Sequence, residues 1–207
     1  MAGRIRSNDP AGVRRRVVEA AAEAFQADGY RGATMQDIIR SAGVSGGAVY
    51  HHFPTKTRLA LAVVVDHVGG EVEQTWKAVV REAPSCAEGV LAAFDGVIAQ
   101  LEAAGVVRGC PLANLALELC LADPGLREAI DAQYRDWRAT VEQKLLADID
   151  QGAAAYAGDD PAAFAAMVVS AYSGAIAMAK AEQGTSALQA CRAQLARLMA
   201  SDSSRPV

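Results

Sequence analysis

Apolar residues recur at three- and four-residue steps along most of this 207-residue chain, and the alternating pattern of strands is nearly absent. The first helical stretch follows Asp9 and Pro10, which place a capping carboxylate before a proline at the first helical position. Its apolar face consists of Val13, Val17, Ala20, Ala21, Ala24 and Phe25. The pattern predicts a helix that Gly29 ends.

Capping residues and prolines predict further helix starts. These starts lie at Thr34 with Asp37, Ser45, Thr55, Ser85 with Glu88, Pro111, Asp123-Pro124, Asp160-Pro161 and Ser186 with Gln189. The helix that begins near Thr55 extends to about Arg81. We therefore predict an all-α protein of about nine helices, with frayed ends at 1–8 and 201–207.

The composition is that of a globular protein, with 52% hydrophobic and 21% charged residues. No run of 18 apolar residues predicts a membrane span, and the N-terminus lacks the apolar stretch of a secretory signal. The cysteines are scattered without a CxxC pair, which favours free thiols in a reducing cytoplasm. They are Cys86, Cys110, Cys120 and Cys191.

Charge is distributed unevenly along the chain. Residues 1–60 carry nine Lys and Arg against five Asp and Glu, whereas the remainder carries eleven bases and nineteen acids. A basic N-terminal segment followed by an acidic remainder suggests that only the N-terminal segment binds a polyanion. Ordinary variation in surface charge explains such a split equally well.

Two short helices joined by a tight turn are predicted over residues 34–53, which is the helix-turn-helix arrangement. Gly43 in the turn is free to take a positive φ angle, and Ala42 is small enough for close helix packing. The small core beneath is predicted to contain Ile38, Val44, Val49 and Phe53.

Gly46 and Gly47 stand side by side at the start of the second of these helices, where each lowers helix propensity by about 1 kcal/mol relative to alanine. One interpretation is that they let the backbone approach DNA closely, since the N-terminal residues of a recognition helix lie deepest in the major groove. The other is a first turn that merely tolerates glycine.

The segment TMQDIIRSAGVSGGAVYHHFPTK, residues 34–56, resembles the DNA-binding domain of the TetR family of bacterial transcription regulators. The preceding AAEAFQADGYRGATM is similar to the first helix and loop of that family, and Ile39 departs from its usual alanine. The family pattern is matched at Thr34, Ile38, Ala42, Gly43, Val44, Ser45, Gly47, Tyr50, His52, Phe53 and Lys56.

The resemblance implies a homodimer with a three-helix DNA-binding domain at residues 1–56 and a larger helical domain at 57–207 that dimerises and binds a small molecule. The dimer would bind a palindromic operator with half-sites roughly 34 Å apart, and ligand would release it. Residue by residue, the resemblance implies DNA contacts at Thr34, Gln36, Ser45, Gly46, Gly47, Ala48, Tyr50, His51, His52 and Lys56.

The segment GCPLANLALEL, residues 109–119, resembles a Gly-Cys segment found in a subset of TetR-like regulators, some of which sense electrophiles or oxidants. A cysteine just before a helix feels the positive end of the helix dipole, which lowers the pKa of a thiol, and this is the physical basis of an interpretation of Cys110 as a sensor. The alternative is that Cys110 packs as a small residue at a helix start.

An effector pocket is expected among the middle helices, largely apolar with a few polar groups, for a neutral or aromatic ligand. The candidate lining residues are Trp76, Phe94, Cys110, Asn114, Tyr134, Trp137 and Tyr172. The helices at 161–184 and 188–200 are rich in small and apolar residues, which favours a four-helix dimer interface. An intramolecular core is the alternative.

Other classes of protein have less support. No HExxH, P-loop, GxSxG or dinucleotide fingerprint is present, so we predict neither an enzyme nor a bound cofactor. His51 and His52 point about 100° apart on a helix and cannot jointly hold a metal. A DNA-binding architectural factor without ligand control remains an alternative, and a well-packed body would favour it.

Overall fold

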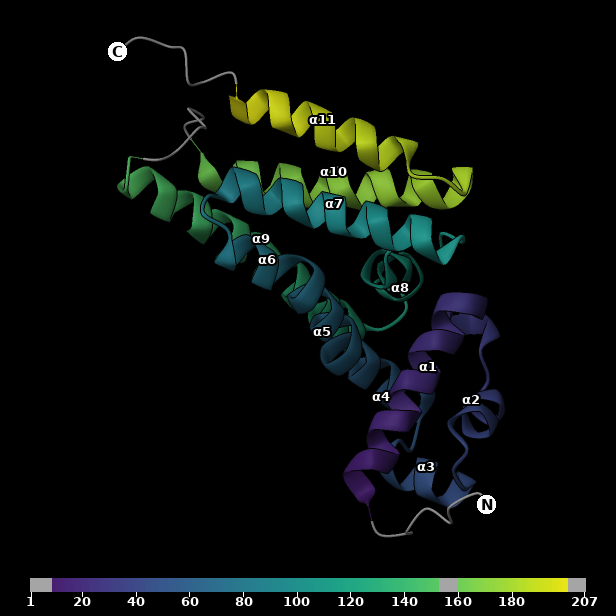
Figure 1. The fold of residues 1–207 in the computed structure, drawn as a ribbon. Helices are drawn as coiled ribbons and strands as arrows, with labels where there is room; N and C mark the ends of the chain where they lie inside the picture. Colours follow the sequence, from purple (N-terminus) through teal and green to yellow (C-terminus); the bar gives the residue numbers. More distant parts are fainter. Residues whose placement is uncertain (1–8, 153–159, 201–207) are drawn as a thin grey trace. The chain divides into compact units, whose positions relative to one another are not determined.

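A computed structural model describes residues 9–152 and 160–200, and every regular element within them is a helix (Figure 1). The first helices are α1 (Pro10–Gly32), α2 (Met35–Ala42), α3 (Gly46–His52), α4 (Lys56–Ala62), η1 (Val63–Val68), α5 (Gly69–Val72), η2 (Glu73–Lys77) and α6 (Ala78–Glu82). They are followed by α7 (Cys86–Ala104), α8 (Pro111–Leu119), α9 (Pro124–Asp150), α10 (Pro161–Glu182) and α11 (Ser186–Ala200). With α4 to α6 counted as one interrupted helix, the described residues form nine helices, which confirms the predicted all-α class.

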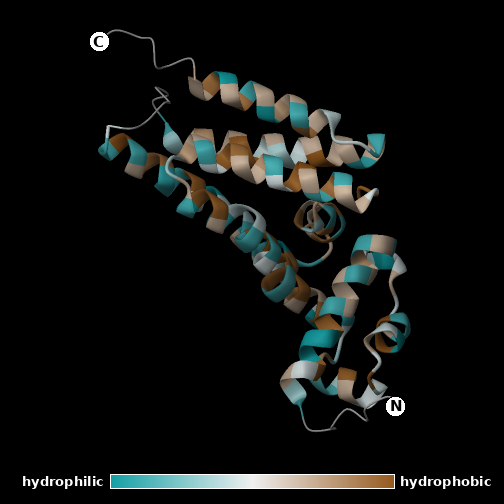
Figure 2. Cartoon of the chain, in the orientation of Figure 1, coloured by the Kyte–Doolittle hydropathy of each residue, from teal (hydrophilic) through white to brown (hydrophobic). Residues whose placement is uncertain are grey.

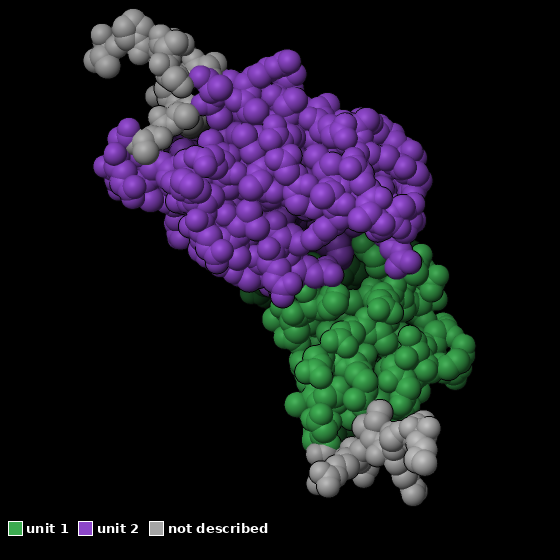
Figure 3. Space-filling model, in the orientation of Figure 1, with its two compact units in different colours: residues 1–69, 114–130 green, residues 70–113, 131–207 purple. Residues whose placement is uncertain are grey.

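The chain divides into two compact units (Figure 3). We call residues 1–69 with 114–130 the N-terminal unit, and residues 70–113 with 131–207 the C-terminal unit. The domain boundary predicted after residue 56 stays a prediction. The ends predicted to fray, 1–8 and 201–207, lie outside the described residues.

Most predicted caps begin their helices as expected, because each capping oxygen accepts a backbone N–H three residues later. These bonds join Gly12 to Asp9 (2.9 Å), Asp37 to Thr34 (3.1 Å), Ala48 to Ser45 (3.3 Å), Arg58 to Thr55 (3.2 Å), Glu88 to Ser85 (3.2 Å), Leu126 to Asp123 (2.9 Å) and Ala163 to Asp160 (3.0 Å).

The cap predicted at Ser186 is wrong. Ser186 is the first residue of α11, and its hydroxyl donates to Glu182 Oε2 at 2.6 Å. Thr185 occupies the capping position, since its carbonyl accepts from the backbone N–H of Gln189 at 3.0 Å and its hydroxyl contacts the Gln189 amide at 3.2 Å. Ser186 with Gln189 fits the capping box, whereas Thr185 is followed by Leu188 at the third position, so the pattern favoured the wrong one of two adjacent hydroxyl residues.

The helix predicted from Thr55 to about Arg81 contains two π-helical turns, η1 and η2, that the sequence pattern does not reveal. In η1 the backbone N–H of Gly69 reaches Val64 O, and in η2 that of Ala78 reaches Glu73 O. A π turn inserts a residue into the helical register and is frequent at functional sites. Trp76 lies within η2.

In the N-terminal unit, α2, α3 and α4 pack against α1. Of the predicted small core, Ile38 and Val49 are fully buried, Phe53 is buried and Val44 is half-buried. Gly43 adopts the left-handed conformation expected of the turn, with φ 64° and ψ 33°. The helix-turn-helix predicted over residues 34–53 is therefore present.

In the C-terminal unit, α7 packs against α6 and α11, and α11 packs against α10 (Figure 1). Gly89 of α7 permits close approach to α6, because a Cβ there would lie 2.7 Å from the Cα of Val80. Arg192 of α11 donates two hydrogen bonds to Asp95 of α7, at 2.7 and 2.8 Å.

Hydrophobic colours dominate α10 along most of its length (Figure 2). By length and composition alone this helix could cross a membrane, but core helices of soluble proteins pass the same test. Only 44% of its most apolar stretch is buried within the chain. α10 therefore carries apolar surface that the described residues of a single chain leave uncovered.

Candidate functional site

The predicted DNA-contacting residues lie on and beside α2 and α3 of the N-terminal unit. Thr34 and Ser45 are the N-caps of the two helices. Gln36, Gly47, Tyr50 and His51 are exposed, and 49% of Tyr50 is accessible to solvent. Gly46, Ala48 and His52 are half-buried. The exposed members offer an amide, a phenol and an imidazole, which are hydrogen-bonding groups suited to base edges or phosphates.

Neither glycine at the start of α3 is required by the chain itself. A Cβ at Gly47 would meet no atom within 4 Å, and one at Gly46 would meet only Ile39 Cδ1, at 3.8 Å. Neither glycine has a positive φ angle, unlike Gly43. Internal packing and backbone conformation therefore do not account for this pair.

Lys56 is less exposed than its predicted role as a phosphate contact suggests. Its ammonium lies 4.5 Å from the centre of the Tyr30 ring, in cation–π geometry. Burial lowers the pKa of Lys56, while the nearby carboxylate of Glu118 acts in the opposite direction. Lys56 thus packs onto the end of α1 while it begins α4.

Glu118 of α8 binds the backbone of α1 where this helix is interrupted, beside Lys56. Gly29 has φ 75° and ψ 163°, which interrupts the helix, as predicted. The freed backbone N–H groups of Tyr30 and Arg31 donate to Glu118 Oε1 and Oε2 at 3.2 and 3.3 Å. One carboxylate therefore satisfies two donors that the broken helix leaves open.

Asn114, one turn before Glu118, donates from its amide to Gln26 Oε1 of α1 at 3.0 Å. It belongs to the N-terminal unit, whereas the aromatic pocket candidates and Cys110 belong to the C-terminal unit. The partner that a half-buried amide requires is thus supplied by α1. The structure does not group Asn114 with the other predicted lining residues.

The structure brings the aromatic candidates together in one cluster, which we call the aromatic cluster: Trp76, Phe94, Tyr134, Trp137 and Tyr172. The Trp76 ring centre lies 4.7 Å from that of Tyr172, 5.0 Å from that of Trp137 and 5.4 Å from that of Phe94. Tyr134 stacks on Trp137 at 6.5 Å, with ring planes 7° apart. Such arrays suit flat aromatic ligands, but they also form ordinary cores.

Both indoles of the aromatic cluster carry a buried donor without an acceptor. Trp76 and Trp137 are each 1% exposed, and neither Nε1 has a hydrogen-bond partner among the described residues. The Ser173 hydroxyl, which follows Tyr172 in α10, is also buried and unpaired there. Buried polar groups without partners are uncommon and require an explanation.

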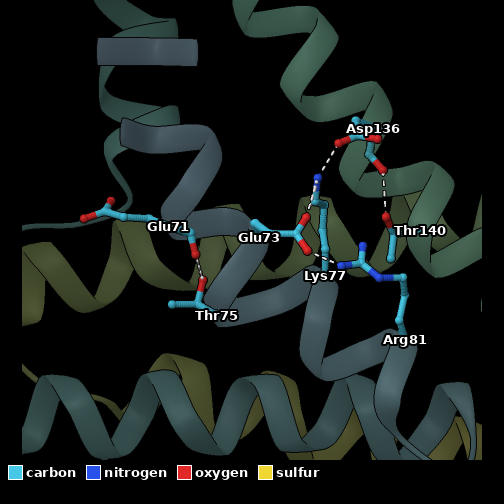
Figure 4. A network of polar contacts seen from close by, with 7 residues as sticks. All are labelled: Glu71, Glu73, Thr75, Lys77, Arg81, Asp136 and Thr140. Carbon is cyan, nitrogen blue, oxygen red and sulfur yellow. Dashed lines mark hydrogen bonds and ion pairs between the residues drawn. The ribbon is translucent and has the colours of Figure 1, made fainter. Parts of the chain in front are cut away.

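A network of charged side chains fixes η2 against α9 next to the aromatic cluster (Figure 4). Lys77, whose side chain is 12% exposed, pairs with Glu73 at 2.9 Å and with Asp136 of α9. Arg81 also binds Glu73. Burial alone would lower the pKa of Lys77, but the bonds from Asp136 and Glu73 outweigh it and raise that pKa. The ammonium therefore stays charged and anchors the turn that carries Trp76.

The lowered pKa that the sensor interpretation of Cys110 requires is not found. Cys110 is 6% exposed, and burial raises the pKa of its thiol. Hydrogen bonds from the backbone of Ala113 and Leu112 act in the direction expected at a helix start, but they are the weaker effect. Desolvation of a thiolate thus outweighs the helix terminus.

An open groove of about 420 Å³ lies in the N-terminal unit, at the end of α3. His52, Phe53, Arg58 and Val65 line part of it, and the ion pair between Arg14 and Asp66 (2.6 Å) lies in its wall. No pattern in the sequence predicted this groove or the contact of Glu118 with the backbone of α1. A lone acidic residue within PLANLALEL was the only signal for the latter. In the described part of the chain, no group of three or more side chains is arranged to hold a metal.

Comparisons with known proteins match both units. Residues 17–63 match the model of the TetR family of bacterial regulatory proteins, and residues 86–194 match that of the LmrA/YxaF-like transcriptional regulator C-terminal domain. The regulator LmrA of Bacillus subtilis is 31% identical over 64% of this chain and 70% of its own length.

Solved structures agree with the fold. A TetR regulator from Chloroflexus aurantiacus, 28% identical, superposes with a TM-score of 0.79 over 90% of this chain and 93% of its own. A cysteine-substituted CifR, 22% identical, was solved on a 26-base-pair operator duplex and superposes with a TM-score of 0.77 over 94% of this chain and 98% of its own. The chain therefore belongs to the TetR family of bacterial transcription regulators, with a C-terminal domain of the LmrA/YxaF-like type.

Proposed function

We propose that this regulator is a repressor that binds a palindromic operator as a homodimer and is released by a small, mainly apolar effector. The observation that carries the proposal is the exposed surface of α2 and α3, with Gln36, Tyr50 and His51 free to meet DNA. The family makes a role in transcription certain, and these side chains supply the chemistry of base recognition.

In this proposal the N-terminal turn of α3 enters the major groove. The absence of any internal need for Gly46 and Gly47 supports the interpretation that their small size serves an external surface. Lys56 and the caps Thr34 and Ser45 lie at helix starts, where backbone N–H groups favour phosphate. CifR, which shares the fold, was solved in complex with an operator duplex, and this supports DNA binding by a protein of this fold.

Dimerisation is assigned to α10 together with α11. Exposed residues recur along α10 at steps of three and four residues and carry no charge from Pro161 to Ala179. They include Ala163, Met167, Ser170, Gly174, Ala177 and Met178. A Cβ at Gly174 would meet nothing within 4 Å, so a second helix has room to approach there. An uncharged helical stripe of this kind suits an isologous interface.

The effector site is assigned to the aromatic cluster in the C-terminal unit, with Cys110 nearby as a neutral, buried thiol. The two unpaired indole donors support a ligand site over a purely structural core. Burial of Cys110 speaks against the alternative of a thiol-based sensor, which requires an accessible thiolate. A site of action in the cytoplasm follows from the role in transcription.

The proposal is tested by selecting operator duplexes from a random pool and measuring their binding by fluorescence anisotropy. We expect a palindromic sequence bound by two chains, and a loss of about tenfold or more in affinity for Tyr50→Ala or His51→Ala. The control Gln100→Ala changes an exposed side chain of α7 and leaves affinity unchanged. A sequence-independent affinity, equal for variants and control, contradicts the proposal and favours an architectural factor.

The dimer is tested separately by sedimentation equilibrium against the chain mass of 21.6 kDa. Gly174→Arg places a charge on the proposed interface, whereas Gly96→Arg places one on α7, where a Cβ also meets nothing within 4 Å. We expect only the first variant to dissociate to monomers. Equal behaviour of the two variants removes α10 from the interface.

A further inference from the structure

We infer that Glu118 of α8, although acidic, is a positioning residue for operator binding: through the backbone of Tyr30 it places the aromatic ring that holds the Lys56 ammonium for a DNA phosphate. This inference rests on the proposed function, in which Lys56 contacts DNA. All three residues belong to the N-terminal unit. One carboxylate binds the backbone of Tyr30, and one ammonium lies over the ring of the same residue.

The first step is the contact between Glu118 and the end of α1. Gly29 leaves the helical conformation, with φ 75°, so the direction of the chain beyond it depends on tertiary contacts. Glu118 supplies two of these, since its two oxygens accept from the backbone N–H groups of Tyr30 and Arg31 at 3.2 and 3.3 Å. Bonds to a carboxylate are charge-assisted, and two of them on successive residues fix the orientation of this segment.

The second step is the placement of the Tyr30 ring. Its centre lies 5.3 Å from that of Phe25 in α1, and its hydroxyl lies 3.4 Å from the Thr57 hydroxyl in α4. The Lys56 ammonium lies 4.5 Å from the same ring centre. The residue that Glu118 orients through its backbone therefore contacts the start of α4 with both its ring and its hydroxyl.

The third step is the state in which Lys56 is held. Lys56 is half-buried, and it forms no ion pair among the described residues. A cation–π contact restrains an ammonium without neutralising its charge, so the charge stays available to a phosphate. A lysine side chain has much rotamer freedom to lose on binding, and one that is already restrained loses less. Burial lowers the pKa of Lys56, and the charge of Glu118 opposes that effect.

The sign of the expected effect separates this inference from ordinary electrostatics. Removing an acidic side chain from a DNA-binding unit reduces repulsion of the polyanion and so favours binding. For Glu118→Ala we expect the opposite, a weaker complex. The matched control is Glu23→Ala, which removes an exposed acidic side chain of α1 and should leave operator affinity unchanged or raise it.

The test measures the affinity of the full-length protein for its selected operator duplex by fluorescence anisotropy at several salt concentrations. Lys56→Met should reduce the slope of log affinity against log salt by about two, because a dimer loses two phosphate contacts. Glu118→Ala should lower affinity by about fourfold or more, since each subunit contributes about twofold or more, and should reduce the slope in the same direction.

A double-mutant cycle shows whether Glu118 acts through Lys56. In the Lys56→Met background, Glu118→Ala should cause no further loss of affinity. A merely structural role would lower affinity by the same factor in both backgrounds. An equal loss in the two backgrounds therefore overturns the inference, as does unchanged or increased affinity for Glu118→Ala.

Variants of Tyr30 test the same route without touching the carboxylate, and they decide the matter if thermal melts show that Glu118→Ala does not fold. Tyr30→Leu removes the ring and should reproduce the loss of affinity and the smaller salt slope. Tyr30→Phe keeps the ring and should restore most of both. Equal affinity of the Leu and Phe variants overturns the inference.

The wild-type protein separates this inference from the proposed function. If it binds no duplex specifically at any salt concentration, the proposed function fails and the inference fails with it. If it binds a palindromic operator but the cycle shows no coupling between Glu118 and Lys56, only the inference fails.

Discussion

Asp148 of α9 accepts a hydrogen bond of 2.6 Å from the backbone N–H of Cys86, the first residue of α7. Asp148 is 4% exposed, and Lys144 Nζ lies 3.9 Å from its other oxygen. A buried carboxylate from one helix thus satisfies the N-terminus of another, where free N–H groups and the helix dipole favour negative charge. The contact ties α9 to α7 within the C-terminal unit.

Replacement of Asp148 should destabilise the C-terminal unit. Asp148→Ala leaves the Cys86 N–H without an acceptor in a buried site, so we expect a loss of about 1–3 kcal/mol in the free energy of unfolding, measured in urea. Asp148→Asn keeps an acceptor oxygen and should lose less. Equal losses would show that the charge, and not the hydrogen bond, stabilises the contact.

Gly47→Ala should raise stability and weaken operator binding at the same time. The added Cβ meets no protein atom within 4 Å and favours the helix by about 0.5–1 kcal/mol. It would stand between the backbone of α3 and DNA, so we expect at least a tenfold loss of operator affinity by anisotropy. Gly96→Ala, on the open surface of α7, is the control for propensity and should leave affinity intact. Unchanged affinity in Gly47→Ala would favour a first turn that merely tolerates glycine.

Gly29→Ala should lower the stability of the fold, whereas Gly32→Ala should not, although both glycines lie at the end of α1. Gly29 has φ 75°, and a Cβ there would lie 3.1 Å from the carboxylate of Glu118. Backbone strain of this kind costs about 1–3 kcal/mol. Gly32 lacks a positive φ angle, and its Cβ would make an ordinary contact with Asp28. Thermal melts of the two variants give the comparison, and similar melting temperatures would refute a strained Gly29.

The four thiols should react in the order of their exposure. Burial is the main cause that raises the pKa of Cys86, to about 12, and it also raises that of Cys110. Cys120 and Cys191 are half-buried and should therefore label first with a thiol reagent at neutral pH, followed by mass spectrometry. Full labelling in urea is the control. Faster labelling of Cys110 than of a free cysteine would restore the sensor hypothesis.

The raised pKa of Cys86 makes the free energy of unfolding depend on pH. An unfolded thiol ionises near its ordinary pKa of 9.0, whereas folded Cys86 stays protonated up to about 12. The unfolded state therefore loses its proton first, and the contribution of Cys86 to stability falls as pH rises from about 9 to about 12. Cys86→Ala should flatten that part of the profile of unfolding free energy against pH. An unaltered slope would assign it to other groups.

Local signals in the sequence predicted the fold well, because the structure uses them locally. Asp9, Thr34 and Ser85 cap the helices that their spacing predicts, and Gly43 takes the conformation that the turn requires. The predictions failed where two adjacent residues can both cap a helix, and where a long helix changes its hydrogen-bond register. Thr185 replaced Ser186 as a cap, and the π turns η1 and η2 leave no trace in the apolar periodicity.

The candidate sites depended on tertiary contacts that spacing cannot supply. The resemblance to the family predicted the exposed surface of α3, and size and polarity suggested the aromatic residues. The neutral state of Cys110 depends on how completely the surrounding helices exclude water, which no property of GCPLANLALEL reveals. The partner of Asn114 is 88 residues away in Gln26, and Glu118 is equally remote from the backbone of Tyr30.

The hydrogen bonds from Tyr30 and Arg31 to Glu118 limit the transfer of the DNA-binding helices to another protein. The N-terminal unit is completed by residues 114–130, so a fragment that stops at residue 69 lacks the carboxylate that closes the break at Gly29. Such a fragment would keep the whole helix-turn-helix yet lose its anchor at the end of α1. Residues 1–69 therefore do not form a self-sufficient DNA-binding domain. Chimaeric regulators built from this chain should contain α8 together with α1.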